Sequence, residues 1–209
     1  MDKNKLSVNT YDKIAQIFAD KYFDYDKDLA YIDLFISKLS PKARILDVGC
    51  GVGGTIKYFR ERGFLIEGID LSPKTIKVAR KKVPQAKFKV MDMRHLDYPE
   101  NSFDALLSIY SLIHIEPRQI SPVLLEFRKV LKEKGLALII VQGGKEDMVL
   151  AEPLNKKLKN YFNFFSKARL NQYLREAGFK VVFQEETSNP DKDCCGEAVI
   201  YTFAQKNIS

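Results

Sequence analysis

The sequence predicts a doubly wound α/β sheet with helices on both of its faces. Short apolar runs without strict polar alternation, typical of strands buried on both faces, alternate along the chain with amphipathic helical stretches. This alternation is typical of right-handed βαβ units with parallel strands. The last two apolar runs are joined by a turn-rich segment without a helix, which predicts an antiparallel pair.

The first 40 residues are predicted to be helical. Apolar residues recur at helical spacing within residues 14–22 and again within residues 29–39. Thr10 and Asp12 are candidate caps for the first helix, because their side chains can accept hydrogen bonds from the free N–H groups of a first turn. Pro41 then breaks the helical pattern.

Strands and helices alternate from there to residue 141. The expected strands are residues 45–48, 65–69, 88–91, 105–109 and 136–141, and the expected helices are residues 55–62, 73–83 and 117–132. Gly63 and Gly135 lie just past helices, where glycine commonly takes the left-handed conformation that ends a helix.

The pattern changes after residue 141. Within residues 143–165 the chain is polar and aromatic by turns, and Leu154, Leu158 and Phe162 lie on one possible helical face. This segment is therefore expected to contain a helix.

A further helix and two strands complete the prediction. Ser166 is the expected cap of a helix that ends at Gly178. Residues 180–184 and 198–204 are the two final strands. Repeats, low-complexity tracts and linkers are missing from the sequence, which favours a single domain.

The composition is that of a globular protein and excludes several classes. The 209 residues are 45% hydrophobic and 29% charged, and the net charge of +7 permits an acidic partner without requiring one. Apolar runs stay well below the roughly 18 residues of a spanning helix, and the first ten residues lack the apolar core of a secretory signal. Three cysteines, with Cys194 and Cys195 adjacent, do not form a disulfide framework, so a reducing cytoplasm is expected.

A glycine-rich turn follows the first expected strand. Gly49, Gly51 and Gly54 satisfy the spacing of a dinucleotide fingerprint, which lets a ligand approach the backbone closely. Asp70, at the end of the next strand, could accept the hydroxyl protons of a ribose. The pattern by itself predicts a bound nucleoside.

Asp47 discriminates between nucleotides by charge. It lies two residues before the first glycine of the turn, at the carboxyl end of the strand. A carboxylate there repels the pyrophosphate of a nicotinamide dinucleotide, whereas it attracts the sulfonium and the α-ammonium of S-adenosylmethionine. The charge favours an S-adenosylmethionine site.

The turn and its neighbours make the sequence similar to the class I S-adenosylmethionine-dependent methyltransferases over nearly the whole chain. The matching segments are DVGCGVG (47–53), GIDLS (68–72), DM (92–93), FDALLS (103–108) and residues 131–138. Their order is much more specific than any one of them. The resemblance implies a Rossmann-like sheet of seven strands, mostly parallel with an antiparallel last strand. It also implies S-adenosyl-L-methionine as the cofactor, with S-adenosyl-L-homocysteine as the product.

The resemblance also implies roles for single residues. Asp70 would hold the ribose and Asp92 the exocyclic amine of adenine, with the thioether of Met93 beside the ring. Residues 11–15 resemble the lid of small-molecule methyltransferases related to the quinone-biosynthesis group, and Cys50 fills a small-residue position without redox chemistry. The expected cofactor-binding residues are Tyr11, Asp47, Gly49, Cys50, Gly51, Asp70, Leu71, Asp92, Met93 and Ile109.

We therefore expect one methyltransferase domain over residues 1–209. Its parts are a helical lid (1–40), a cofactor-binding core (41–142), an acceptor-side insertion (143–165) and a C-terminal helix with the last two strands (166–209).

His114 is the candidate catalytic base. It follows the fourth strand, at the carboxyl edge where open α/β sheets bind ligands, and an unperturbed pKa near 6.5 suits proton transfer. Alternatively, its ring orients the loop, because a base is needed only when the acceptor must lose a proton. His95 lies past the adenine position and is not expected to act as a base. Tyr11, Tyr22 and Tyr110 could close over the sulfonium, or simply pack against their neighbours.

Missing motifs favour a small-molecule acceptor. Residues 108–111 read SIYS in place of the Asn/Asp-Pro-Pro-Tyr/Phe sequence of DNA amine methylation, and the chain has no Pro-Cys pair for attack on a pyrimidine. The carboxylates and histidines form no compact magnesium set, so no metal is expected. The lysine-rich residues 74–89 fit a solvated face, whereas the lysines of 156–159 beside the aromatic residues of 161–165 suit an apolar or anionic acceptor or a nucleobase.

The prediction is direct in-line displacement onto a small molecule, by a monomer or homodimer without a membrane span. Two alternatives stay open: a methyltransferase acting on RNA or protein, which the basic charge permits, and a non-catalytic S-adenosylmethionine-binding module. A nicotinamide dehydrogenase is opposed by Asp47 and by the lack of a separate catalytic domain. The sequence does not identify the acceptor.

Overall fold

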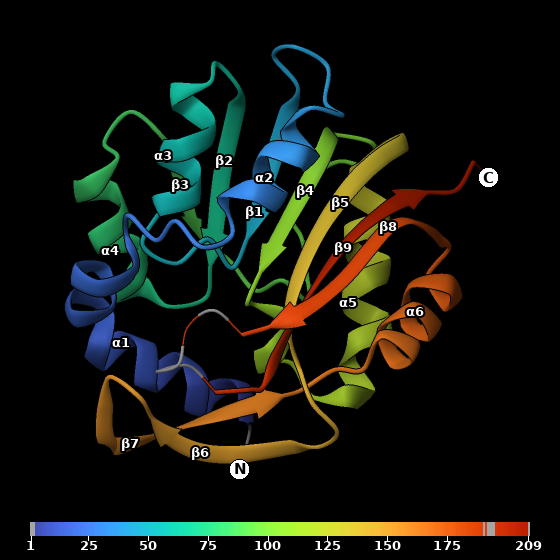
Figure 1. Ribbon diagram of the computed structural model, residues 1–209. Helices are drawn as coiled ribbons and strands as arrows, with labels where there is room; N and C mark the ends of the chain where they lie inside the picture. The colour runs from blue at the N-terminus through green and yellow to red at the C-terminus, as the bar shows by residue number, and fades with distance from the viewer. Residues whose placement is uncertain (1–2, 190, 192–194, 209) are drawn as a thin grey trace.

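The structure is a computed structural model that describes residues 3–189, 191 and 195–208 (Figure 1). Cys194 lies outside the described residues, and Cys50 and Cys195 are free thiols. In chain order the elements are α1 (Lys3–Tyr22), α2 (Leu29–Ile36), β1 (Arg44–Val48), α3 (Gly54–Glu61), β2 (Leu65–Asp70), α4 (Pro73–Lys82), β3 (Lys87–Val90), β4 (Phe103–Ile109), the 3-10 turn η1 (Leu112–His114), α5 (Pro117–Val130), β5 (Leu131–Gly143), β6 (Asp147–Glu152), β7 (Asn155–Asn163), α6 (Lys167–Glu176), β8 (Phe179–Ser188) and β9 (Ala198–Lys206).

Seven strands form the main sheet in the order β3-β2-β1-β4-β5-β9-β8. The first five run parallel to one another, whereas β9 is antiparallel to both β5 and β8. This arrangement confirms the predicted sheet and its antiparallel last strand. The strand order reverses at β1 and β4, and a crevice for ligands opens at such a switch point beyond the carboxyl ends of the strands.

Two apolar cores cover the two faces of the sheet. Successive residues of a strand point to opposite faces, so Ile45 packs against α2, α3 and α4, while Leu46 packs against α5 and α6. The same alternation separates Leu107 from Leu106 in β4. Helices therefore lie on both faces, as predicted.

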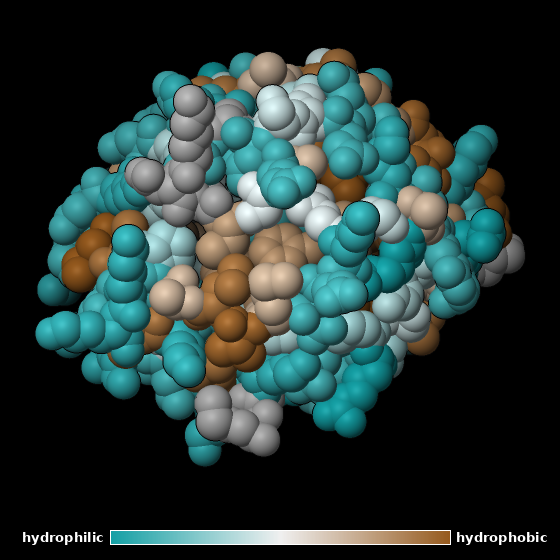
Figure 2. Space-filling view, turned by 60° about the horizontal axis from the view of Figure 1, so that its bottom comes forward, coloured by the Kyte–Doolittle hydropathy of each residue, from teal (hydrophilic) through white to brown (hydrophobic). Residues whose placement is uncertain are grey.

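The N-terminal helix α1 and a separate β-hairpin lie across the carboxyl ends of the parallel strands (Figure 1). The surface on this side is mostly hydrophilic around a central apolar area (Figure 2). Within the described part of the chain, no helix combines the length and apolarity needed to cross a membrane.

The hairpin corrects the helix expected within residues 143–165. Strands β6 and β7 pair as an antiparallel two-stranded sheet. A spacing of four residues, as between Leu158 and Phe162, keeps side chains on one face of a strand as well as of a helix. The pattern therefore did not distinguish a strand from a helix. The hairpin is held in place at the end of β7, where Tyr161 and Phe162 are buried.

Two smaller expectations were also wrong. Helix α1 begins at Lys3, so Thr10 and Asp12 lie inside it, and their side chains make tertiary hydrogen bonds to Lys159 and Ser72 instead of capping it. Gly135 does not end α5: the left-handed residue is Lys134, with φ of 62°.

A glycine stands at position 135 because there is no space for a side chain. A Cβ atom at this position would lie 2.8 Å from the carbonyl oxygen of Lys132, so the glycine permits a close backbone approach. Gly63 and Gly178, with φ of 84° and 80°, do follow their helices as predicted.

Candidate functional site

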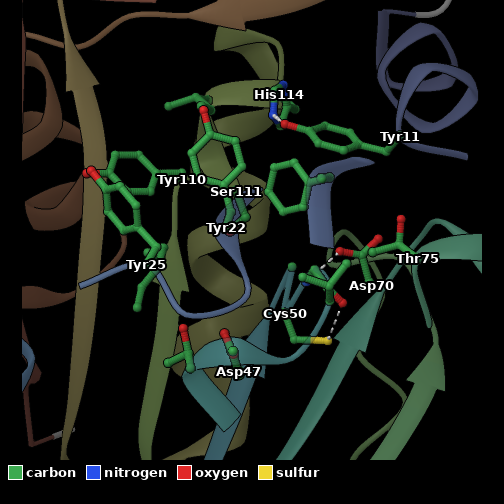
Figure 3. Close-up of a pocket in the computed structure, with 18 of the residues that line it drawn as sticks. Tyr11, Tyr22, Tyr25, Asp47, Cys50, Asp70, Thr75, Tyr110, Ser111 and His114 are labelled. Carbon is green, nitrogen blue, oxygen red and sulfur yellow. Dashed lines mark hydrogen bonds between the residues drawn. The ribbon is translucent and has the colours of Figure 1, made fainter. Parts of the chain in front are cut away.

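A cavity of about 380 Å³ opens at the carboxyl ends of β1, β2 and β4, beneath α1 (Figure 3). Its size is in the range of small-molecule sites. All the residues expected to bind the cofactor line this cavity, and so does His114. His95 and the exposed lysines of α4 and β3 are not among its lining residues.

The glycine turn brings backbone rather than side chains to the cavity. The N–H groups of Gly49 and Cys50 both donate to the carbonyl of Ile69, at 2.8 and 2.9 Å, which ties the turn to the end of β2. Gly49 has φ of 77°, and a Cβ atom there would lie 2.3 Å from the Cβ of Ser111. Only glycine fits both requirements.

Asp70 closes the turn from the neighbouring strand. Its Oδ2 accepts from the N–H of Gly51 at 3.0 Å, and its Oδ1 accepts from the N–H of Ser72 at 2.8 Å. Burial raises the pKa of Asp70 above its usual range, against the lowering effect of these hydrogen bonds. The carboxylate is therefore rigidly placed at the cavity wall.

Asp47 is a buried carboxyl group beside the same turn. It is 2% exposed, and burial together with the charge of Asp70 raises its pKa to about 8. A cation that enters the cavity would favour the charged form and lower this pKa. A positively charged ligand would therefore be bound favourably beside Asp47.

Asp92 and Met93 line the cavity just after β3. Asp92 pairs with the guanidinium of Arg94 at 2.5 Å and also accepts from the Arg94 N–H, and these contacts lower the pKa of Asp92. Asp92 is thus an ionised acceptor at the edge of the cavity, held by a neighbour that the sequence did not single out.

Tyr11 and His114 meet at the top of the cavity (Figure 3). Nδ1 of His114 lies 2.8 Å from the carbonyl oxygen of Tyr161, which can only accept, so Nδ1 carries the proton. Nε2 is then the acceptor for the phenol of Tyr11, at 3.0 Å. Burial lowers the pKa of His114 to about 4, so the imidazole is neutral at pH 7. The sequence suggested both residues but not their pairing.

A row of aromatic rings continues from Tyr11 along the lid. Ring centroids are 5.5 Å apart for Tyr11 and Phe18, 4.9 Å for Phe18 and Tyr22, and 5.8 Å for Tyr22 and Tyr25. All four line the cavity. Aromatic faces attract cations, so this row adds to the effect of the buried carboxylates.

Sequence reasoning missed Asp28 entirely. It precedes α2, is 3% exposed, and its Oδ1 accepts from the phenols of Tyr201 at 2.8 Å and Tyr110 at 3.1 Å. Tyr110 follows β4 with φ of 51°, an uncommon conformation for a bulky residue. No sequence pattern links these residues, which are far apart in the chain.

The comparisons with known proteins agree with this geometry. Residues 45–135 match a family model described as a methyltransferase domain. Methyltransferase GfsG of Streptomyces halstedii is 34% identical over 118 residues, which are 52% of this chain and 42% of that protein. The chain belongs to the class I S-adenosylmethionine-dependent methyltransferases. This membership confirms the predicted family and the cofactor that defines it.

Other methyltransferases resemble it over longer stretches. Phosphoethanolamine N-methyltransferase 1 of Arabidopsis thaliana is 31% identical over 163 residues, which are 74% of this chain and 33% of the relative. A 2-methyl-6-phytyl-1,4-hydroquinone methyltransferase of Synechocystis is 32% identical over 124 residues, which are 57% of this chain and 38% of the relative. The chain thus spans less than half the length of these three curated relatives.

Solved structures share the fold of this chain. A methyltransferase from Methanosarcina mazei has a TM-score of 0.78 at 18% identity, covering 84% of this chain and 98% of its own. A 1,6-didemethyltoxoflavin-N1-methyltransferase from Burkholderia thailandensis, solved with S-adenosylhomocysteine, has a TM-score of 0.74 at 22% identity, covering 96% and 85%.

Proposed function

We propose that this chain transfers the methyl group of S-adenosylmethionine to a small organic acceptor by direct in-line displacement. One observation carries the proposal: a single cavity joins the glycine turn and Asp70 to a second wall formed by α1, Asp28 and Tyr110. Helix α1 lines this space from the side opposite the glycine turn, so a cofactor and an acceptor could meet in one cavity. In-line displacement needs mainly the alignment of nucleophile, methyl group and leaving sulfur, which such a cavity can supply.

The residues present fit the proposed cofactor. Gly49 and Gly51 would let it approach the backbone, Asp70 would accept its ribose hydroxyls, and Asp92 and Met93 would flank its adenine. Leu71, Cys50 and Ile109 line the same part of the cavity. When bound, S-adenosylmethionine supplies an electrophilic methyl group on a sulfonium.

The charge of the cavity supports a cationic cofactor over a phosphorylated one. Among the described lining residues, Lys57 is the only lysine or arginine, and it pairs with Asp24 at 2.8 Å. A pyrophosphate would therefore meet the buried Asp47 and Asp70 without a compensating cation.

Tyr11 and His114 would position the reacting groups. The neutral imidazole accepts a hydrogen bond from the phenol of Tyr11, and both residues line the cavity, where the phenol could contact a polar group of the acceptor. We therefore propose that His114 acts through Tyr11, and that proton transfer from an acidic acceptor would pass along this pair. An acceptor that is already nucleophilic would use the pair for orientation alone.

The proposal is tested by mass spectrometry. The purified protein is incubated with S-adenosylmethionine and panels of amines, phenols and thiols, and S-adenosylhomocysteine and methylated product are measured together. We expect stoichiometric formation of both for at least one small acceptor. Binding of S-adenosylmethionine without turnover on any panel or metabolite extract would support a non-catalytic binding module instead.

A further inference from the structure

A carboxylate at the far wall of the cavity has half of its hydrogen-bonding capacity unused. Asp28 is 3% exposed and lines the cavity. Both phenols that it binds, those of Tyr110 and Tyr201, donate to Oδ1. Within the described part of the chain, no hydrogen bond or ion pair reaches Oδ2. Because Asp28 lines the cavity, this second carboxylate oxygen is available to accept a hydrogen bond from a ligand donor there.

Aromatic rings surround the same carboxylate. Tyr25 and Tyr110 lie next to each other on one side of the cavity (Figure 3). Tyr31 stacks on Tyr201, with ring centroids 3.7 Å apart. Tyr22 continues this wall through its contact with Tyr25. Desolvated aromatic faces beside a carboxylate form a site for an organic ammonium.

A second buried carboxyl group lines the same cavity, which disfavours an anionic ligand. Glu152 is 5% exposed, lines the cavity, and accepts from the backbone N–H of Leu154 and the amide of Asn160. Burial raises the pKa of Asp28, a cost that a bound cation would offset. Tyr201 belongs to β9 and Tyr110 follows β4, so the wall lies across the sheet from Asp70 and Asp92, which follow β2 and β3.

We propose that Asp28, with the rings of Tyr25 and Tyr110, forms a subsite for an amino group of the methyl acceptor, so that the acceptor is a small organic amine. That the bound amine is the methyl acceptor rests on the proposed function. That the subsite binds an amine does not depend on it. Oδ2 of Asp28 accepts a hydrogen bond from the ammonium, and the tyrosine rings face its positive charge. An alkylammonium could also come from the α-amino group of the cofactor, and the test distinguishes the two.

The test measures binding to the protein saturated with S-adenosylhomocysteine, by ligand-observed NMR. The probes are n-propylammonium and n-propanol at pH 7, which have similar shapes but different charges. We expect n-propylammonium to bind at least about tenfold more tightly, as for hydrogen bonds to charged groups. Equal affinities in the wild-type protein would overturn the proposal.

Asp28→Asn is the informative variant. The amide keeps an Oδ1 for the phenols of Tyr110 and Tyr201 but replaces the open oxygen with a donor. We expect this variant to lose the preference for n-propylammonium. Asp33→Asn, an exposed change within the helix α2 that Asp28 precedes, should retain the preference. A preference that persists in Asp28→Asn contradicts the proposal. If Asp28→Asn does not fold, Tyr25→Leu replaces it, and an unchanged preference in that variant contradicts the proposal equally.

Two cofactor analogues show whether the subsite binds the ammonium of the acceptor or that of the cofactor. S-adenosylhomocysteine carries the α-amino group, whereas 5′-methylthioadenosine lacks it. We expect Asp28→Asn to bind both within about twofold of the wild-type affinities. A selective loss of S-adenosylhomocysteine affinity would assign the subsite to the cofactor and overturn the proposal. If S-adenosylhomocysteine fails to bind the wild-type protein at all, the proposed function fails, whatever the result with the amine.

Discussion

The carboxylate of Asp12 in the lid helix accepts a hydrogen bond of 2.6 Å from the hydroxyl of Ser72, the N-cap residue of α4. The same carboxylate oxygen accepts from the N–H of Lys74 at 3.1 Å. These contacts tie α1 to the helix that follows Asp70. The lid is therefore fastened next to the proposed ribose position.

Asp12→Ala should loosen the lid. Hydrogen bonds to a charged group contribute about 1.5–3 kcal/mol, so we expect the dissociation rate of S-adenosylhomocysteine to rise about tenfold or more in stopped-flow measurements. Asp20→Ala, an exposed change in the same helix whose carboxylate accepts a hydrogen bond from the amide of Gln16, is the matched control. Equal dissociation rates in the two variants would show that this contact does not hold the lid.

Asp70→Ala should weaken cofactor binding and also destabilise the glycine turn. We expect a loss of about 1.5–3 kcal/mol in calorimetric binding of S-adenosylhomocysteine, because Asp70 is proposed to accept from its ribose. The thermal midpoint should also fall, because the N–H groups of Gly51 and Ser72 lose their acceptor. Asp70→Asn should recover part of the stability but not the affinity. Wild-type affinity in a folded Asp70→Ala would place the ribose elsewhere.

Binding of S-adenosylmethionine should release a proton from Asp47. The pKa of Asp47 is raised to about 8 in the free protein, and a nearby sulfonium or ammonium favours its charged form. Below pH 8 the ligand must therefore displace up to about one proton, and affinity should increase with pH towards 8. Calorimetry in buffers of contrasting ionisation enthalpy measures this release, which Asp47→Asn should abolish. Buffer-independent enthalpies at pH 6.5 would contradict the proposed proximity.

Tyr11 and His114 should behave as one unit. Tyr11→Phe and His114→Ala should each lower turnover by about 10²-fold or more if the pair transfers a proton. The double variant should lose little more than either single variant, because they break the same hydrogen bond. Fully additive losses, measured on the true acceptor, would separate the two residues functionally.

The pH dependence of stability tests the environment of His114. Its pKa is lowered from 6.5 to about 4 in the folded protein, so the unfolded state binds the proton more readily. The unfolding free energy of the wild-type protein, relative to His114→Gln, should therefore fall as the pH decreases from 6.5 towards 4. Denaturant titrations across this range measure the difference, and parallel curves for both proteins would mean that His114 titrates normally.

The sequence determined the sheet and the cofactor edge, because both depend on local patterns. Apolar runs specify strands buried on both faces, and the glycines from Gly49 to Gly54 specify a turn that only they can form. Asp47 and Asp70 end adjacent strands, and parallel strands place such residues at one edge. The expected cofactor-binding residues therefore line one cavity, because parallel strands end at the same edge of the sheet.

The hairpin and the acceptor wall were decided by tertiary structure. The spacing of Leu158 and Phe162 fits both a helix and a strand, and only packing of β7 against α1 selects the strand. Asp28 and Tyr201 are 173 residues apart, and Tyr11 and His114 are 103 apart. No local propensity encodes such pairs, because they form only when the lid and the far strands of the sheet come together around the cavity.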